Sequence, residues 1–464
     1  MQRIAEDSYQ TLLGRLLQSI RGQRPGSPMG RLGDLGRVPV VEFVDRMIEE
    51  ALRLRASDIH IEPYRGAVRI RYRVDGRLLE THAPVPMEVH AFLLARIKVM
   101  AHLDSVEHRA AQDGRMRYTP SDGTEPVDIR VATLPLLAGE KAVLRLLHRS
   151  QDLLEIGNLY FSERNEKLFR WLCHQPGGMA LIVGPVNSGK TTTLYAALSE
   201  INSPERNIMT IEDPPEYHID GINQVQVNVK TGLTYAVGLR ALLRSDIDEI
   251  VLGEIRDAET AEMAIRAALT GHLLFSTMHT KDAVSAVFRL LDMGVPAYLL
   301  AAALSGVLAQ RLVRRSCPCC REPFSAELPL WAQADGQTGR VTLWKNSGCA
   351  ACGGTGFLGR IALHELLFVD EALEQAVLER ASLGEMRALA RSQGMTTLLE
   401  DGLEKAGQGL TTLEEVARVL YGGEADGDEA VLSGRPAGRL ADDTAANSAS
   451  SGGDAGKGDG SFGV

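Results

Sequence analysis

A glycine-bounded loop between an apolar run and a Lys-Thr-Thr-Thr segment has the residue types that bind a phosphate chain. Gly184, Gly189, Lys190 and Thr191 have the spacing of the phosphate-binding loop, in which backbone N–H groups and the positive end of the following helix face an anion. Lys190 would reach the outer phosphates, and the Thr191 hydroxyl would join the shell of a magnesium ion. A Gly-rich turn before an ordinary helix is the alternative, but the predicted strand 180–183 and helix 191–201 favour a nucleoside triphosphatase. The nucleotide-binding residues predicted here are Gly184, Pro185, Asn187, Ser188, Gly189, Lys190, Thr191 and Thr192.

Acidic and histidine side chains follow three further apolar runs that we predict to be strands. Glu212 follows the run 207–211, Glu254 follows 249–253, and His279 comes just after 273–277. The carboxyl ends of parallel strands present the ligand site of a sheet. A carboxylate there can deprotonate an attacking water or hold a metal through water. A lone histidine is more often structural, but His279 in this place is a candidate for sensing the γ-phosphate.

Four cysteines have the spacing of a zinc site. Cys317 and Cys320 form one Cys-x-x-Cys pair, Cys349 and Cys352 form another, and a spacer of 28 residues separates the pairs. Four thiolates placed in this way can hold one tetrahedral Zn²⁺, although reduced, metal-free thiols are the alternative. Cys319 is a spare sulfur in the first pair, and the two-residue gap favours Cys320 as the ligand.

Composition restricts the class of protein. The chain has 464 residues, 44% of them apolar, which is enough for two to four packed domains. Its 50 basic and 60 acidic residues give a net charge of −10, which argues against a general nucleic-acid binder. Six cysteines, four of them in pairs, do not suit a secreted disulfide scaffold and favour a reducing cytoplasm. We find no signal peptide, and the longest apolar stretch, 297–309, is too short to span a bilayer.

The elements before the phosphate loop fall into three parts. Residues 5–21 have the apolar spacing of an amphipathic helix, which either packs on the protein itself or docks on another protein or a membrane surface. Residues 23–36 are typical of a linker. A separate α/β domain follows, with a strand at 68–74 that Asp75-Gly76 closes as a hairpin. Arg69, Arg71 and Arg73 share one face of that strand, either as a solvated surface or in contact with a ligand or partner. Further strands are predicted at 115–118, 127–133 and 142–147.

Helices alternate with strands after residue 150, as they do in an α/β fold with a parallel sheet. We predict helices at 163–173, 235–244 and 258–269, and a polar segment at 221–232. The chain after the cysteines to Tyr421 is predicted to be helical, and the Gly, Ala, Ser and Asp-rich tail from Gly422 to be disordered. The predicted divisions are 1–37, 38–150, 151–315, 316–362, 363–421 and 422–464.

These motifs occur in the same order in a known family. Over about residues 38–421 the chain resembles the secretion ATPases of the type II secretion and type IV pilus assembly family. The segments that carry the resemblance are an aspartate box (210–216), a Walker B segment (250–257), a histidine box (271–280), two N-terminal segments (56–63 and 112–115) and the metal module (348–360). The chain departs from the pattern at Val186-Asn187, where the family usually has Thr-Gly. Since Asn187 can adopt a positive φ, we expect the loop to keep its shape.

The resemblance implies an α/β architecture with a RecA-like P-loop NTPase core, a smaller PAS-like N-terminal domain, a four-Cys zinc module and a helical C-terminal segment. It implies a homohexamer that binds ATP, Mg²⁺ and Zn²⁺. Arg115 and Arg130 would reach the phosphates from the mobile N-terminal domain, and Glu254 would be the catalytic carboxylate, with Lys190 and His279 beside it. The remaining side chains that would line this site are Glu212, Arg240 and His272.

The function that the resemblance implies is ATP hydrolysis that drives pseudopilus assembly and protein export, or type IV pilus assembly. Its partners would be the inner-membrane platform and cytoplasmic-domain proteins of that machine, with contact to acidic lipid, and no specific nucleic acid is expected. The protein would be cytoplasmic and peripheral to the inner membrane. Two rivals remain at this point. One is a DNA-dependent ATPase whose basic patch is Arg311, Arg314, Arg315 and Arg321, and the other is a nucleotide-gated scaffold without useful turnover.

Overall fold

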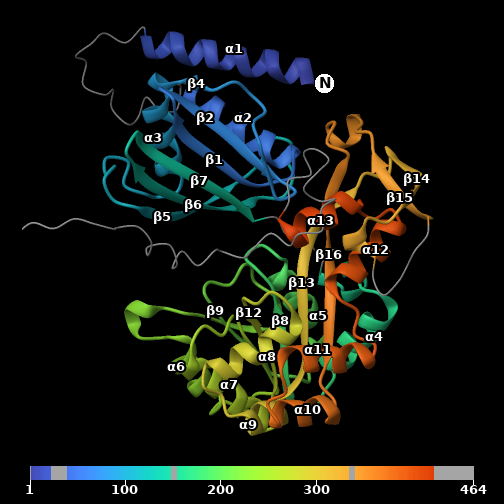
Figure 1. The fold of residues 1–464 in the computed structure, drawn as a ribbon. Helices are drawn as coiled ribbons and strands as arrows, with labels where there is room; N and C mark the ends of the chain where they lie inside the picture. Colours follow the sequence, from blue (N-terminus) through green and yellow to red (C-terminus); the bar gives the residue numbers. More distant parts are fainter. Residues whose placement is uncertain (1, 22–38, 148–153, 334–339, 423–464) are drawn as a thin grey trace, which may run out of the picture.

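Two lobes make up the part of the chain that is described. The computed structural model describes residues 2–21, 39–147, 154–333 and 340–422. The N-terminal lobe lies at the top of Figure 1 and the lobe that carries the phosphate loop lies at the bottom, with C-terminal helices beside both. The predicted linker at 23–36 and nearly all of the predicted tail lie outside the described residues.

The N-terminal lobe is an antiparallel sheet with helices on one face. The strands follow the order β3-β2-β1-β7-β6-β5, and β4 pairs with β2. The elements are α1 (Gln2–Arg21), α2 (Pro39–Arg53), β1 (Ala56–Tyr64), β2 (Ala67–Val74), β3 (Arg77–Leu79), β4 (Val85–Pro86), α3 (His90–Met100), β5 (Gln112–Tyr118), β6 (Val127–Leu136) and β7 (Gly139–Leu147).

Alternation along β2 explains which face of this sheet is covered. Val68, Ile70 and Tyr72 are buried in the core of the lobe, whereas the arginines between them are half-buried on the opposite face. Arg69 and Arg71 contact Glu62 of β1 at 3.3 and 2.6 Å. The predicted hairpin is present, because Asp75 and Gly76 both adopt positive φ and join β2 to β3.

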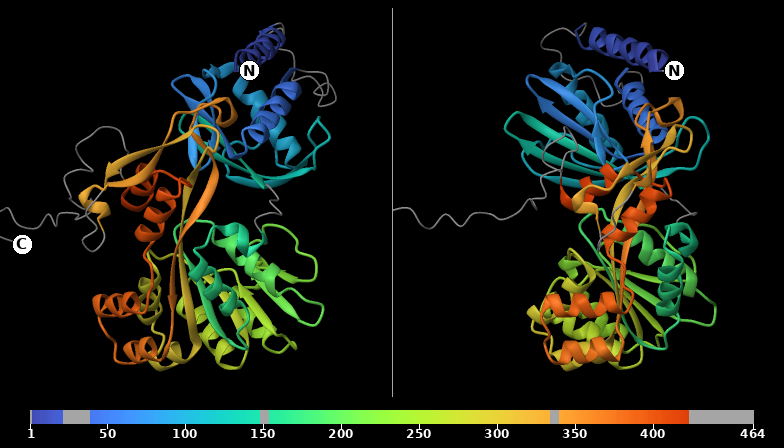
Figure 2. Two further views of the ribbon diagram at one scale, coloured as in Figure 1. Left: turned by 90° about the vertical axis from the view of Figure 1, so that its right-hand side faces the viewer. Right: turned by 45° about the vertical axis from the view of Figure 1, so that its right-hand side comes forward.

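Helix α1 packs against its own lobe. Tyr9 and Leu16 are buried, and the Tyr9 ring stacks on His82 at a centroid distance of 3.8 Å. Figure 2 shows α1 lying along the outer side of this lobe, away from the rest of the chain. Of the two alternatives for the apolar face of this helix, packing on the protein itself is the one that the structure contains. None of the helices in the described part of the chain combines the length and apolar composition that crossing a membrane requires.

The second lobe is built on a mostly parallel sheet of order β10-β9-β11-β12-β8-β13-β16, in which only β16 is antiparallel to its neighbour. Its central strands are buried on both faces, as parallel strands covered by helices must be. The strands are β8 (Gly178–Val183), β9 (Ile208–Glu212), β10 (Asn223–Gln226), β11 (Glu249–Leu252), β12 (Leu273–Met278), β13 (Leu304–Ser316) and β16 (Phe357–Phe368). The helices are α4 (Glu163–Cys173), α5 (Lys190–Ile201), α6 (Tyr235–Leu242), α7 (Ala258–Leu269), α8 (Ala283–Asp292) and α9 (Ala297–Ala303).

Two stretches differ from the elements that the sequence predicts. The polar segment 221–232 contains β10, an edge strand of half-exposed residues that forms because it pairs with β9. The range 363–421, predicted to be helical, begins with the end of β16. That apolar run is a strand because it pairs with β13 along most of its length.

β13 and β16 leave the sheet together and carry the cysteines at their outer ends. The sequence between β13 and β16 forms a separate two-stranded hairpin, and helices pack beside the pair of long strands. The predicted boundaries near residues 315 and 362 therefore fall inside or at the end of strands that the core and the cysteine module share. The remaining elements are β14 (Arg321–Glu327), β15 (Arg340–Asn346), α10 (Glu371–Leu378), α11 (Leu383–Ser392), α12 (Leu398–Gly407) and α13 (Leu413–Tyr421).

Candidate functional site

The phosphate loop connects the buried strand β8 to helix α5. Gly184, Asn187 and Gly189 adopt positive φ values of 152°, 64° and 88°, so the expected positive φ of Asn187 is present. A Cβ at Gly184 would lie 2.5 Å from the Gln310 carbonyl oxygen, and one at Gly189 would lie 2.6 Å from the Gln310 side-chain nitrogen. Only glycine fits at both positions, which is why the loop can turn its backbone inward.

Lys190 lies folded over this loop. Its Nζ donates to the carbonyl oxygens of Gly184 and Pro185, each at 2.9 Å. Burial lowers the pKa of Lys190 to about 8, although nearby Glu254 favours the charged form. Thr191, the next residue, is exposed at the first turn of α5. The lysine thus rests on weak neutral acceptors that an anionic phosphate could replace.

Glu254 and His279 meet Lys190 at the same edge of the sheet. His279 Nε2 lies 3.4 Å from Glu254 Oε2, and His279 Nδ1 lies 3.2 Å from the Gly184 carbonyl oxygen and 3.5 Å from Lys190 Nζ. Glu254 also pairs with Arg256. Glu254 and His279 lie just after β11 and β12, and Lys190 begins α5 after the loop that follows β8, so the rule for parallel sheets brings them together as the sequence predicts.

Hydroxyl groups of β12 hold the end of β11 that precedes Glu254. The Ser276 hydroxyl donates to the Leu252 carbonyl oxygen and the Thr277 hydroxyl to the Gly253 carbonyl oxygen, both at 2.8 Å. These bonds are buried or half-buried, and they supplement the backbone pairing of the two strands. The position of Glu254 relative to His279 is therefore fixed by both strands.

Glu212 lies at the end of β9, but its carboxylate is already hydrogen-bonded to other side chains of the protein. It is buried, and its two carboxylate oxygens accept from the Tyr195 hydroxyl at 2.5 Å and the Thr210 hydroxyl at 2.6 Å. The Tyr195 oxygen in turn accepts from the Glu216 backbone N–H at 3.1 Å. Glu212 thereby connects helix α5 to the loop after β9, and positions that loop.

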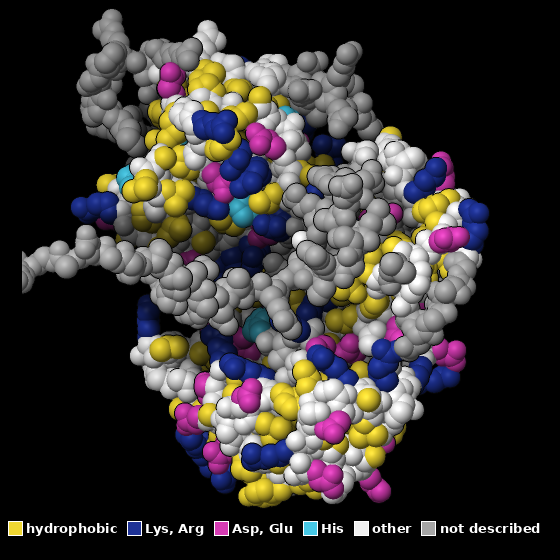
Figure 3. All heavy atoms as spheres, viewed as in Figure 1, with side chains coloured by type: hydrophobic (Ala, Val, Ile, Leu, Met, Phe, Trp, Pro, Cys, Tyr) yellow, Lys and Arg dark blue, Asp and Glu magenta, His cyan; other side chains and the backbone are white. Residues whose placement is uncertain are grey.

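One arginine of the N-terminal lobe contacts this same loop. Arg130 of β6 donates to the Pro215 carbonyl oxygen at 3.1 Å and pairs with Glu216 at 3.2 Å. Arg115 of β5 lies directly opposite Arg130 in the β5–β6 pairing and is exposed. Figure 3 shows Lys and Arg side chains gathered along the hollow between the two lobes. The conformation described here places Arg130 on the loop after β9 and not on the phosphate loop.

Two of the predicted site residues contact other parts of the protein. Arg240 pairs with Glu259 at 2.8 Å on the exposed surface between α6 and α7. His272 precedes β12, next to the start of β8, and its Nδ1 lies 3.1 Å from the Ala267 carbonyl oxygen at the end of α7. The phosphate loop begins at the other end of β8, about 17 Å along the strand. His272 therefore does not line the nucleotide site formed by the phosphate loop of its own chain, and the prediction is corrected on that point.

Sequence reasoning missed Gln310, the buried residue behind the phosphate loop. Gln310 lies on β13, which pairs with β8 up to Ala309 and Val183. Its side-chain amide bonds to the loop and to the first turns of α5. The polar pair Gln310-Arg311 within the otherwise apolar run 307–313 was the only signal, and it gave no indication of which strand lies alongside.

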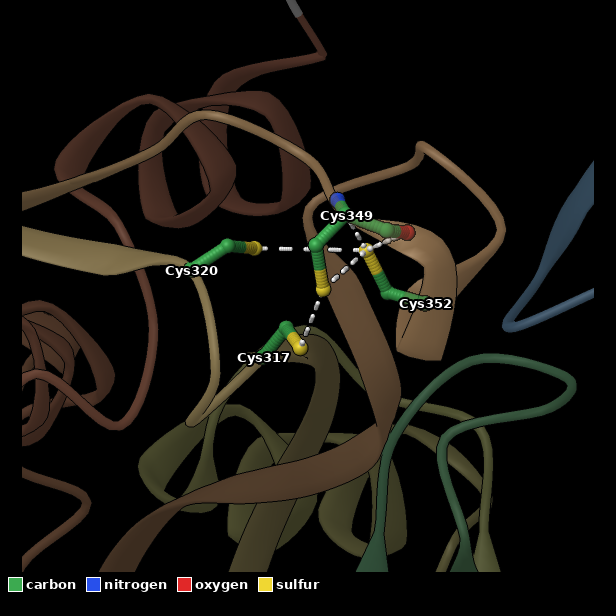
Figure 4. Close-up of side chains that lie close together, drawn as sticks. All are labelled: Cys317, Cys320, Cys349 and Cys352. Atoms are coloured by element: carbon green, nitrogen blue, oxygen red, sulfur yellow. Dashed lines mark hydrogen bonds between the residues drawn. The ribbon is translucent and has the colours of Figure 1, made fainter.

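The four cysteines form a compact cluster at the outer ends of β13 and β16 (Figure 4). Their sulfur atoms all lie within 4.8 Å of one another, with Cys317 Sγ 3.8 Å from Cys349 Sγ and Cys320 Sγ 3.9 Å from Cys352 Sγ. Zn–S bonds of about 2.3 Å in a tetrahedron require sulfur atoms about 3.8 Å apart. Cys319 is exposed and is not one of the four.

The environment of Cys352 also suits a thiolate. Its Sγ accepts from the backbone N–H groups of Cys349 and Gly356, each at 3.2 Å. Although burial opposes ionisation, these donors lower the pKa of Cys352 to about 6. The donor set and its spacing thus fit a tetrahedral Zn²⁺, which Cys317, Cys320, Cys349 and Cys352 would hold.

A family model described as "Type II/IV secretion system protein" matches residues 34–418. The chain belongs to this family. It is 48% identical to the type II secretion system protein E of Pectobacterium carotovorum over 383 residues, which cover 82% of this chain and 76% of that protein. It is 47% identical to the type IV pilus assembly ATPase PilB of Thermus thermophilus over 378 residues, which cover 81% of this chain and 42% of that protein.

The fold agrees with this assignment to the type II/IV secretion family. The X-ray structure of the Legionella pneumophila ATPase DotB matches with a TM-score of 0.60 at 22% identity, covering 87% of this chain and 98% of that chain. The predicted RecA-like α/β fold and the resemblance to secretion ATPases are confirmed. This member of the family is an ATP-hydrolysing enzyme of secretion.

Proposed function

We propose that this ATPase drives pseudopilus assembly and protein export by a type II secretion system. It works as a homohexamer at the cytoplasmic face of the inner membrane, in contact with the platform and cytoplasmic-domain proteins of the machine and with acidic lipid. The observation that carries the proposal is the convergence of Lys190, Glu254 and His279 at one sheet edge in a chain that is 48% identical to a type II secretion protein E.

Each side chain at that edge has a chemical task in hydrolysis. Lys190 neutralises the outer phosphates, and Thr191 supplies a hydroxyl to the Mg²⁺ that accompanies ATP. Glu254 accepts the proton of the attacking water, and His279 holds Glu254 and responds to the γ-phosphate. The four thiolates hold a structural Zn²⁺ that joins the outer ends of β13 and β16.

The arginines of the N-terminal lobe complete the charge neutralisation when the lobes close. Arg130 already contacts the loop after β9, and Arg115 is its direct cross-strand neighbour. A closing movement would exchange the Glu216 carboxylate for the phosphates, because both are anions that a guanidinium binds. Hydrolysis would then release the arginines and let the lobes separate.

A type IV pilus assembly ATPase is the second candidate, favoured by the identity to the Thermus thermophilus PilB. Co-purification from membranes of the native host, with the tagged full chain and its Glu254→Gln variant held in the ATP state, tests the choice. Recovery of type II secretion platform components supports export, and recovery of pilus platform components contradicts it. A scaffold without turnover is contradicted if the Glu254→Gln variant binds ATP but loses secretion.

The arginines of the DNA-dependent rival have partners within the protein. The four arginines on which it depends are engaged within the protein: Arg311 donates to the Lys281 carbonyl oxygen, Arg314 to Glu415, Arg315 to the Leu358 carbonyl oxygen and Arg321 to the Gly409 carbonyl oxygen. Arg314 is paired with a carboxylate, and the other three guanidinium groups are directed at carbonyl oxygens of the protein, which favours a structural role for all four. Addition of DNA is therefore expected to leave the ATPase rate unchanged.

A further inference from the structure

Gln310 contacts both ends of the phosphate loop. β13 pairs with β8 as far as Ala309 opposite Val183, so that Gln310 lies beside the first residue of the loop. A Cβ on Gly184 would lie only 2.5 Å from the Gln310 carbonyl oxygen. At the other end of the loop, a Cβ on Gly189 would lie 2.6 Å from the Gln310 side-chain nitrogen. One residue of a neighbouring strand therefore lies close against both loop glycines.

The side-chain amide of Gln310 donates one buried hydrogen bond and accepts another. Its Nε2 donates to the Ser188 carbonyl oxygen at 2.8 Å, and its Oε1 accepts from the Thr193 hydroxyl at 2.8 Å. Gln310, Ser188 and Thr193 are 2%, 3% and 1% exposed. The bond to Ser188 fixes the orientation of this buried amide, because a flip would place Oε1 against the Ser188 carbonyl oxygen, one acceptor against another.

The bond to Ser188 determines where the next backbone N–H points. In a trans peptide the C=O and the following N–H lie in one plane and point in opposite directions. Since Gln310 holds the Ser188 carbonyl oxygen on the β13 side of the loop, the Gly189 N–H is directed to the other side. That side is the one where Lys190 and the start of α5 would receive an anion.

We propose that Gln310 is a positioning residue of the nucleotide site, which aims the Gly189 N–H at the phosphate chain and fixes α5 through Thr193. It acts through the loop and does not touch the nucleotide. The inference rests on the proposed nucleotide site and deepens it, because it assigns the orientation of one phosphate-binding N–H to a strand outside the recognised motif.

The test compares two nearly isosteric variants of the purified full chain. Gln310→Met removes both hydrogen bonds, whereas Thr193→Val removes only the bond to α5. Gln310→Met is expected to weaken MgADP binding and to raise KM for ATP about tenfold, the effect of one hydrogen bond to a charged phosphate. Because such a bond is present in both the ground state and the transition state, kcat should fall by less than about threefold. Thr193→Val should raise KM by about threefold at most.

The outcomes separate this inference from the proposed function. Thermal unfolding of each variant shows whether it is folded, and Gln310→Asn, whose amide is one methylene shorter, replaces Gln310→Met if that variant does not fold. A wild-type KM in the folded Gln310 variant, or a fall in kcat at unchanged KM, overturns the positioning role. Lys190→Ala is measured in parallel, because unchanged MgADP binding there would contradict the nucleotide site itself.

Discussion

His279 joins the two halves of the candidate catalytic site, because one ring nitrogen lies 3.4 Å from Glu254 and the other lies 3.2 Å from the Gly184 carbonyl oxygen. The histidine therefore contacts both the carboxylate that would activate water and the first residue of the phosphate loop. If nucleotide displaced the loop, the His279 ring would transmit that movement to Glu254. The relationship makes Glu254 the first residue to test.

Glu254→Gln is expected to retain ATP binding and to lower kcat by about 10²–10⁴-fold, the contribution of a general base. The amide keeps the size of the carboxylate but cannot accept the proton of the attacking water. Equilibrium binding of ATP and steady-state hydrolysis check the two parts separately. Glu262→Gln, which removes a surface carboxylate that pairs with Arg266 on α7, is the matched control and should hydrolyse ATP normally. Equal rates for the Glu254 variant and this control would contradict the assignment.

Nucleotide affinity is expected to fall as the pH rises above about 8. Burial lowers the pKa of Lys190 to about 8 in the nucleotide-free protein, so its ammonium loses its proton in this range. Binding of phosphate requires the charged form, and nucleotide binding will therefore take up a proton at pH 8–10. Isothermal titration in buffers of different ionisation enthalpy counts that proton.

The same shift makes a prediction about folding stability, with the sign set by linkage. Because the folded-state pKa of Lys190 is lower than the unfolded value, the unfolded chain binds more protons between about pH 8 and 10.5. The contribution of Lys190 to stability therefore increases with pH in that window. The control for the binding prediction is Lys190→Arg. This variant should abolish the proton uptake that accompanies nucleotide binding, since arginine stays charged throughout. Persistent uptake in that variant would assign the titration to another group.

Arg115→Ala and Arg130→Ala are each expected to lower kcat about 10³-fold, the lower end for an arginine supplied to a phosphoryl transfer from a mobile element. Arg117→Ala is the matched control, because Arg117 lies two residues from Arg115 on the same exposed strand face. The measurement is ATPase activity at saturating nucleotide in the assembled protein. Normal turnover after both arginines are replaced would remove the N-terminal lobe from the mechanism.

Cys320→Ser is expected to reduce bound zinc to well below one equivalent per chain and to lower the melting temperature. Cys319→Ser should leave both unchanged, because Cys319 is exposed and does not belong to the cluster. Elemental analysis of protein purified without added metal, followed by thermal unfolding with and without chelator, gives both readouts. If the two variants hold equal amounts of zinc, Cys320 is not a ligand.

The parts of the site that were predictable are those encoded in local sequence. The phosphate loop has its own spacing, and the strand-end rule placed Glu254 and His279 beside it. The same rule could have excluded His272, since this histidine precedes its strand and so lies at the opposite edge of the sheet. The four cysteines were predictable because two local pairs already contain the ligand set.

The parts that were not predictable depend on pairing between distant segments. The role of Gln310 follows from the position of β13 next to β8, which nothing in the run Val307–Val313 specifies. β10 has few apolar residues and is a strand only because β9 lies beside it. The apolar run of β16 fits either a helix or a strand until its antiparallel partner β13 is known.

β13 carries Gln310 behind the phosphate loop and ends at Ser316, next to the first cysteine of the cluster. β13 pairs with β16 with one irregularity between Arg314 and Ser316, so the insertion or deletion of a further residue between Gln310 and Cys317 would shift that pairing and move one of them from its place. Changes of length should therefore be tolerated in the β14–β15 hairpin but not in this short connection. Relatives of this protein can be expected to vary in the length of the β14–β15 hairpin and to keep the number of residues between Gln310 and Cys317 constant.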